Sequence, residues 1–183
     1  MTTGRASDLS VLTESAEELA QMAARVLRAA NSRGWCVATA ESCTGGLLAS
    51  LLTDIEGLSS CFERGFVAYS LESKAGMLGI ERIEIERHGA VSKEIALEMA
   101  QGALGSSRAD VAVAITGFAG PAGKRDETGL VHVAVQSRGG KMVHRECHFG
   151  DAGRERTRQL AARAALEMLE SVVNEVPVNP PAD

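Results

Sequence analysis

A serine followed closely by two glycines is the first feature of this sequence that can do chemistry. Residues 42–46 read Ser-Cys-Thr-Gly-Gly, which places the glycines at Gly45 and Gly46. Glycines at the start of a helix let the backbone approach a ligand, and the free N–H groups there favour an anion or an oxyanion. Ser42 is therefore a candidate nucleophile, provided that a base reaches it. The alternative is that Ser42 or Thr44 only caps a helix while the glycines ease a tight turn.

A base for this serine can come from residues 69–74, which read Tyr-Ser-Leu-Glu-Ser-Lys. Lys74 stands at the start of an expected short helix, next to a buried strand. Partial desolvation in such a place lowers the pKa of a lysine from its usual value of about 10.4, so that the neutral amine can act as a base. Ser–Lys pairs are a known alternative to the Ser–His–Asp triad. The alternative is a surface lysine whose stem lies over apolar neighbours.

A third segment begins at Thr116, is rich in glycine and follows the clearest buried strand of the chain. It fails the phosphate-loop pattern, because Phe118 stands where that pattern requires glycine and Arg125 where it requires serine or threonine. What remains is a loop in which Gly117 and Gly120 permit close backbone contact with a ligand. A plain turn is the alternative.

Two further sets of polar side chains permit ligand binding, and each has a simpler explanation. His144, Glu146 and His148 alternate along a strand, so they share a face and can hold a metal ion. A solvated face of an outer strand gives the same pattern, and we expect neither a metal nor a cofactor. Arg154 and Arg158 lie one turn apart on the last helix and can clamp a phosphate, although a solvated helix face explains them equally.

The elements that must position these segments alternate between helix and strand. The capping box Ser15-x-x-Glu18 predicts the start of a helix that Gly34 ends. Further helices are expected at 47–52, 71–78, after Ser92 and at 153–173, and strands at 35–40, 65–69, 111–115, 130–136 and 142–149. The last two strands form a hairpin, so the predicted fold class is α/β, a single layered α/β/α domain with a mixed central sheet. Ligands bind at the carboxyl ends of strands in such sheets, and we therefore expect the three loops to converge there.

Length and composition exclude several classes of protein. The 183 residues fit one domain, with a polar lead-in at 1–10, the domain itself at 11–174 and a Pro-rich tail at 175–183. Aromatic residues make up only 3% and the net charge is −5, which argues against nucleic-acid binding and predicts a core of Ala, Val, Leu and Ile. No apolar run has the length of a membrane span and no signal peptide is visible, so we expect a cytoplasmic protein whose four cysteines are free thiols.

Four short motifs follow one another in order over about residues 15–170. They are Ala40-Glu41-Ser42-Cys43-Thr44-Gly45-Gly46, then Phe62-x-x-Gly65-x-x-x-Tyr69-Ser70-x-x-x-Lys74, then Gly89-Ala90-Val91-Ser92 with Met99-Ala100, and Thr116-Gly117-x-Ala119-Gly120-Pro121-x-Gly123. In this order and spacing the chain resembles the CinA C-terminal domain family. The enzymatic members of that family are nicotinamide-nucleotide amidohydrolases. The resemblance implies hydrolysis of the carboxamide of nicotinamide mononucleotide (NMN) to nicotinate mononucleotide and ammonia, in pyridine-nucleotide recycling.

The resemblance also implies roles for individual residues. The serine, tyrosine and lysine that the family uses fall on Ser42, Tyr69 and Lys74. In the mechanism we expect, Lys74 accepts the Ser42 proton through or beside the Tyr69 hydroxyl, and N–H groups near residues 44–46 hold the oxyanion. The loop from Thr116 to Gly120 and an arginine of the last helix, Arg158, are expected to bind the phosphate and ribose. The family resemblance further suggests a homo-oligomer.

The sequence departs from the family pattern in two places. Residues 124–129 read Lys-Arg-Asp-Glu-Thr-Gly where the family commonly continues through Pro-Val-Gly, and the segment around 150–151 carries about two extra residues. The second departure leaves the choice among Arg154, Arg156 and Arg158 open. A non-catalytic ligand-binding or interaction module, linked to competence or DNA damage, is the alternative function. The joint presence of Ser42 and Lys74 with the tyrosine argues against it, since a binder needs no activated serine.

Overall fold

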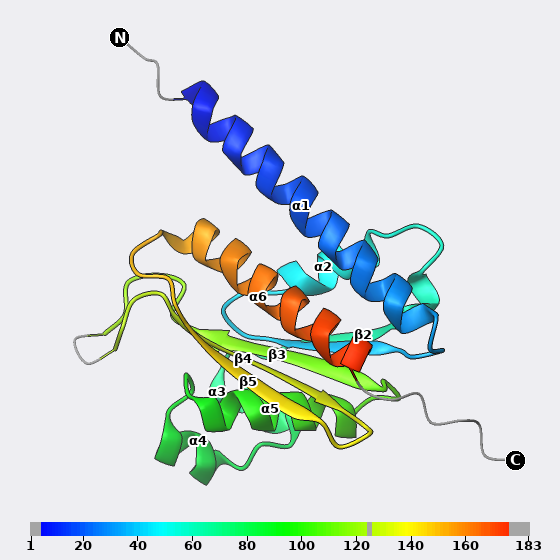
Figure 1. Ribbon diagram of the computed structural model, residues 1–183. Coiled ribbons are helices and arrows are strands. Elements are labelled where there is room, and N and C mark those ends of the chain that lie inside the picture. The colour runs from blue at the N-terminus through cyan, green and yellow to red at the C-terminus, as the bar shows by residue number, and fades with distance from the viewer. Residues whose placement is uncertain (1–4, 124–125, 176–183) are drawn as a thin grey trace, which may run out of the picture.

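A five-stranded mixed sheet forms the centre of the protein in this computed structural model, which describes residues 5–123 and 126–175 (Figure 1). The strand order is β2-β1-β3-β4-β5. β1 runs parallel to both β2 and β3, while β4 is antiparallel to both β3 and β5. The strands span Val37–Glu41 (β1), Phe62–Val67 (β2), Val111–Gly117 (β3), Leu130–Ser137 (β4) and Met142–His148 (β5). The expected mixed α/β sheet with its terminal hairpin is confirmed.

Helices cover both faces of this sheet, which gives the three predicted layers (Figure 1). One face carries α1 (Arg5–Asn31), α2 (Leu47–Thr53) and α6 (Arg154–Glu175). The other carries α3 (Leu71–Leu78), α4 (Arg82–His88) and α5 (Lys93–Gly105), and a short 3-10 turn at Ser59–Cys61 precedes β2. Within the described part of the chain, no helix has both the length and the apolar character that crossing a membrane requires.

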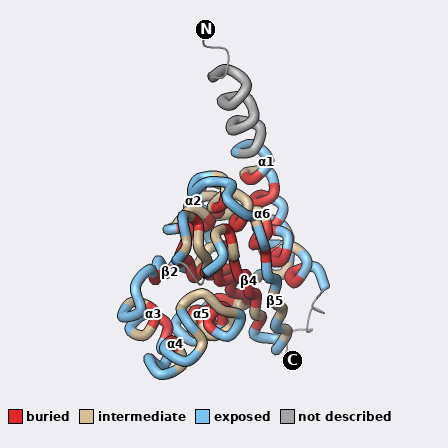
Figure 2. The backbone as a smooth tube through the Cα atoms, turned by 90° about the vertical axis from the view of Figure 1, so that its left-hand side faces the viewer, coloured by how far each residue is buried: buried red, intermediate tan, exposed pale blue. Residues whose placement is uncertain are grey.

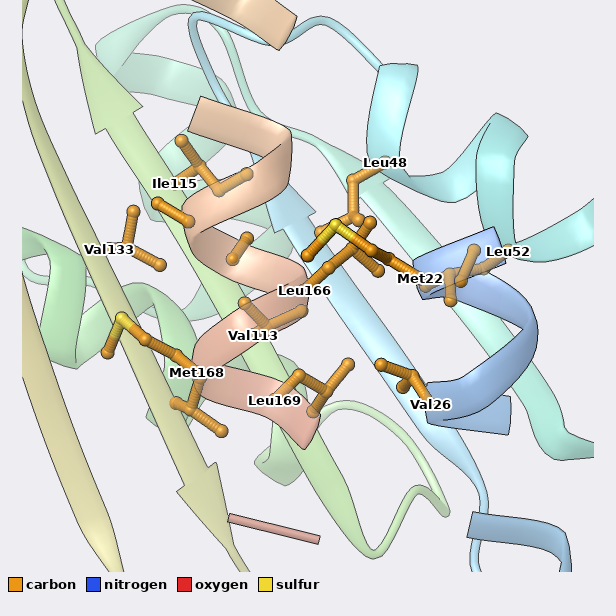
Figure 3. Packing of buried hydrophobic residues seen from close by; sticks show 14 of the residues in the cluster. Met22, Val26, Leu48, Leu52, Val113, Ile115, Val133, Leu166, Met168 and Leu169 are labelled. Atoms are coloured by element: carbon orange, nitrogen blue, oxygen red, sulfur yellow. The ribbon is translucent and has the colours of Figure 1, made fainter. Parts of the chain in front are cut away.

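The core is built almost without aromatic rings, as the composition predicts. Along β3, Val111, Val113 and Ile115 face α1 and α6, whereas the alanines between them face α5. Figure 3 shows Val113 and Ile115 packed with Leu166 of α6, and Figure 2 shows the buried residues concentrated along the sheet. A strand that buries both faces has no polar alternation, which is why its sequence is a continuous apolar run.

Three elements differ from the sequence-based expectation. α1 begins at Arg5 rather than at Ser15, because residues 5–14 contain neither proline nor glycine to end the helical hydrogen bonding. The expected strand at 65–69 is β2, which begins and ends earlier, and α4 was not predicted because its N-cap residue Glu81 makes no side-chain capping bond. The Pro-rich segment from 176 onward lies outside the described residues.

Candidate active site

The three loops singled out in the sequence do converge at the carboxyl ends of β1, β2 and β3. They line a cavity of about 290 Å³. Parallel strands β1, β2 and β3 end at the same edge of the sheet, so the segments that follow them meet there. The side chains or backbone that line the cavity include those of Ser42, Tyr69, Lys74, Thr116, Gly117, Gly120 and Arg154.

Ser42 and Lys74 form a buried hydrogen-bonded pair. Lys74 Nζ lies 2.8 Å from Ser42 Oγ and donates a second hydrogen bond, 2.9 Å long, to the backbone oxygen of Ala68. The lysine side chain is only 1% exposed, and burial lowers its pKa from 10.5 to about 8. A neutral amine has two N–H groups and one lone pair, so it can donate to Ala68 and accept the serine proton at once.

The N-terminal cap of α3 fixes the position of Lys74. Ser70 is the N-cap residue, and its side chain and that of Ser73 form a capping box: Ser73 N donates to Ser70 Oγ and Ser70 N to Ser73 Oγ. Lys74 follows in the first turn, and its Nζ reaches Ser42 after β1 and the Ala68 carbonyl after β2. The predicted helix at 71–78 is therefore confirmed, and its cap fixes the position of Lys74.

The loop after β1 is held by a buried carboxylate rather than left open for an anion. Gly45 and Gly46 adopt left-handed conformations, with φ of 61° and 93°, which a residue with a side chain rarely adopts. Glu41, which is fully buried, accepts hydrogen bonds from the N–H groups at the start of α2, those of Gly46, Leu48 and Ala49.

This carboxylate changes the expected oxyanion site. The N–H of Gly46 is bonded to Glu41, and that of Gly45 donates to the Ser42 carbonyl oxygen at 3.1 Å. The expectation that both glycines hold the oxyanion is therefore not met. Among the described residues, the backbone N–H group of Thr44 has no hydrogen-bond partner, and that of Cys43 contacts only its own thiol. They directly follow the serine, and Cys43 lines the cavity.

Arg154 and Arg158 of α6 make different contacts from those that the sequence predicted. Arg158 donates from Nε and Nη2 to the carbonyl oxygen of Thr44, at 3.0 and 2.5 Å, and does not line the cavity of Ser42. Arg154 does line it, and its guanidinium lies so close to Gly120 that a Cβ there would be 2.7 Å from Nη2. Because of the extra residues before α6, the sequence did not indicate which arginine of this helix faces the cavity.

Two of the predicted binding residues do not offer their hydroxyls to the cavity. Thr44 is fully buried and does not line the cavity, and its hydroxyl has no hydrogen-bond partner among the described residues. Thr116 is also fully buried, and its hydroxyl donates a 2.7 Å hydrogen bond to the Ala90 carbonyl oxygen, which holds the segment before α5 against the cavity. Residues 116 and 117 both line the cavity, and the Thr116 hydroxyl hydrogen is already donated to Ala90.

Tyr69 lies at the mouth of the cavity. Its side chain is 67% exposed, and its hydroxyl has no hydrogen-bond partner among the described residues. Because Lys74 contacts Ser42 directly, no relay through the tyrosine is needed between the two. Its phenol is instead free to meet a ligand that enters.

Comparison with known proteins agrees with the architecture of this site. A family model described as the CinA C-terminal domain matches residues 19–173. The chain belongs to this family. It is 48% identical over 155 residues to the nicotinamide-nucleotide amidohydrolase PncC of Escherichia coli strain K12, covering 83% of this chain and 93% of that protein. It is also 45% identical over 143 residues to a CinA-like protein of Syntrophobacter fumaroxidans, covering 78% of this chain and 34% of that longer protein.

Solved structures of the CinA family have the same fold. The competence/damage inducible protein CihA of Agrobacterium tumefaciens superimposes with a TM-score of 0.82 at 45% identity, over 86% of this chain and 96% of that one. A competence damage-inducible protein A of Klebsiella pneumoniae gives 0.82 at 33% identity, over 87% and 99%.

The histidines of this CinA C-terminal domain lie away from the cavity as hydrogen-bonded pairs. His132 Nδ1 and His144 Nε2 are 3.1 Å apart with stacked rings, and His148 contacts Glu146 and Glu127. Among the residues that the structure describes, no three His, Cys, Asp or Glu side chains are placed to hold a metal ion.

Proposed function

We propose that this protein hydrolyses the carboxamide of NMN to nicotinate mononucleotide and ammonia, with Ser42 as nucleophile and Lys74 as base. The hydrogen bond between a buried lysine and a serine at the end of a parallel strand carries the proposal. Substrate choice is supported by the 48% identity to a protein named nicotinamide-nucleotide amidohydrolase. The same pair in a cavity of about 290 Å³ suits a small carboxamide better than a macromolecule.

Acylation begins when neutral Lys74 removes the Ser42 proton and Oγ attacks the carboxamide carbon. The N–H groups of Cys43 and Thr44 receive the oxyanion that develops. Lys74 then returns its proton to the nitrogen of the tetrahedral intermediate, the C–N bond breaks and ammonia leaves an ester on Ser42. Water, deprotonated by Lys74, cleaves that ester and restores the serine.

Tyr69 acts on the bound substrate in this proposal. Its exposed hydroxyl stands at the cavity mouth, where it can hydrogen-bond to the leaving nitrogen or to the attacking water once the pocket is filled. It does not carry the proton between Ser42 and Lys74, which are in direct contact.

The nucleotide part of the substrate lies along the loop after β3. Arg154 supplies the cation for the phosphate. The Arg154 guanidinium leaves no room for a side chain at residue 120, and the glycine there lets the backbone approach the ligand. Arg154 replaces Arg158, whose Nε and Nη2 donors are bonded to the Thr44 carbonyl.

We also propose that the reaction takes place in the cytoplasm and that the chain works as a homo-oligomer. All four cysteines are free thiols, which suits a reducing compartment. Size-exclusion chromatography with light scattering tests the assembly, and a monomer at micromolar concentration would contradict it.

The decisive experiment is ammonia release from NMN by the purified protein, compared with release from nicotinamide, NAD, asparagine and glutamine. We expect NMN to give the highest kcat/KM. Tight binding of NMN without ammonia release would instead favour a non-catalytic binding module. Preference for one of the other four compounds would keep the hydrolase and overturn the proposed substrate.

A further inference from the structure

We propose that Arg158 and Glu41 are positioning residues that clamp the nucleophile loop, residues 42–46, from its two sides. Arg158 holds the carbonyl side of this loop, and Glu41 holds its N–H side. The inference rests on the proposed function for its meaning, because the loop matters only if Ser42 is the nucleophile. Neither side chain touches the substrate in this proposal, so both act through the loop.

The peptide between Thr44 and Gly45 is fixed at both ends. Its N–H donates to the Ser42 carbonyl oxygen at 3.1 Å. Its carbonyl oxygen accepts from Leu47 N at 3.3 Å and from Nε and Nη2 of Arg158 at 3.0 and 2.5 Å. This orientation turns the oxygen toward α6. The preceding N–H groups are left to the proposed oxyanion, so rotation of this peptide would disturb them.

The other side of the loop is fixed by a buried charge. Both oxygens of Glu41 are engaged, Oε2 by the N–H groups of Gly46 and Leu48 at 3.1 and 3.0 Å and Oε1 by Ala49 at 2.8 Å. A carboxylate that accepts from the start of a helix is stabilised by the orientation of the peptide dipoles. Glu41 also ends β1 and precedes Ser42, so it ties the strand, the loop and α2 together.

The loop needs such a clamp because of its own composition. Two consecutive glycines in left-handed conformations give the turn its shape, and the same residues have the widest choice of conformations in the absence of restraints. Charged hydrogen bonds are roughly twice as strong as neutral ones, so two ionic partners can hold a loop that its side chains cannot.

A substrate-binding role for Arg158 makes a different prediction, which gives the test. The variants are Arg158→Met and Arg158→Lys, with Arg156→Met as control. Arg156 hydrogen-bonds to Gln159 on α6 and does not line the cavity of Ser42. It also does not line the neighbouring cavity, which is formed by Leu47, Arg154, Glu155, Arg158 and Gln159. Each is assayed on NMN and on nicotinamide riboside, which lacks the phosphate. The rate at which a fluorophosphonate labels Ser42 is measured in parallel.

We expect Arg158→Met to lower kcat on both substrates by about 30-fold, with KM changed less than about threefold, and to slow labelling of Ser42 similarly. Arg158→Lys, which keeps a charged donor group but loses the paired Nε and Nη2 geometry, recovers part of that loss. The proposal is overturned if Arg158→Met raises KM for NMN alone and leaves labelling at the wild-type rate, because that is the behaviour of a phosphate ligand.

Glu41→Gln tests the other side. Glutamine keeps one acceptor oxygen and turns an N–H₂ group toward an N–H of α2, so we expect a loss of about tenfold in kcat and in the labelling rate at unchanged KM. Cooperative thermal unfolding shows that the variant is folded, and a wild-type labelling rate in that folded variant would refute the clamp. The labelling rate does not depend on NMN, so an inactive wild type that still reacts with the probe would refute the substrate and leave the clamp standing.

Discussion

Two glycine-rich loops follow neighbouring parallel strands, and they are held in different ways. The loop after β1 is fixed by ionic side chains, Glu41 on one side and Arg158 on the other. Among the described residues, the hydrogen bonds of the loop after β3 join neutral groups, such as Phe118 N to Leu130 O at 2.9 Å and Ala122 N to Thr128 Oγ1 at 3.1 Å. Both loops line one cavity, but within the described part of the chain only the backbone of the first is hydrogen-bonded to ionic side chains.

The two kinds of restraint match the roles that the proposed function assigns to the two loops. A nucleophile and its oxyanion site must keep their geometry through the reaction, because preorganised dipoles stabilise a transition state only when they need not reorient. A loop that surrounds a nucleotide must instead leave space and approach closely, which Gly120 permits beside Arg154. Changes in the first loop should therefore reduce kcat, and changes in the second should raise KM.

Removal of the nucleophile gives the largest effect. Ser42→Ala is expected to lower ammonia release from NMN by about 10⁴-fold or more, because no other side chain of the cavity replaces the hydroxyl. Ser50→Ala, on the exposed surface of α2, serves as the matched control and should keep wild-type activity. Near-normal turnover by Ser42→Ala would remove the covalent mechanism altogether.

Replacement of the base should have the second largest effect and a signature in pH. Lys74→Met is expected to lower kcat by about 10³-fold. In the wild type, burial depresses the lysine pKa to about 8, so the neutral, active form accumulates and kcat rises as pH increases through that value. The variant should lack this step, while Lys93→Met, at an exposed position at the start of α5, should retain it. If both variants showed the wild-type pH profile, Lys74 would not be the base.

The loop after β3 is tested by its arginine. Arg154→Met is expected to raise KM for NMN by about 30-fold while kcat changes little, because only ground-state attraction of the phosphate is lost. Nicotinamide riboside should show no such increase. A fall in kcat with unchanged KM would mean that this arginine serves the reaction centre, and the distinction between the loops would then fail.

The smallest effect is expected at the cavity mouth. Tyr69→Phe should lower kcat by about fivefold, because the hydroxyl meets the substrate and lies outside the Ser42–Lys74 contact. Steady-state kinetics on NMN measures this directly, with Leu71→Ala as an exposed neighbour that lacks a polar group. A loss comparable to that of Lys74→Met would show that the phenol carries the proton after all.

Much of this molecule is determined by the sequence alone. The continuous apolar runs predict the buried strands, Ser92 acts as the expected helix cap, and the order of the motifs identifies the family. Ser42 and Lys74 were nominated by their types and their neighbours. These features are local, because the hydrophobic period, the turn residues and the helix caps each depend on a few consecutive residues.

Only the tertiary structure decided what those residues touch. Glu41 accepts hydrogen bonds from the N–H groups at the start of α2, Arg158 donates to the Thr44 carbonyl, and Arg154 faces the cavity. These arrangements depend on contacts between segments up to 114 residues apart in the chain. A glutamate at a strand end and an arginine on a helix carry the same local signal whether they bind a substrate or the backbone. Their partners are chosen by the packing of α2 and α6 on one face of the sheet, which no short window of sequence contains.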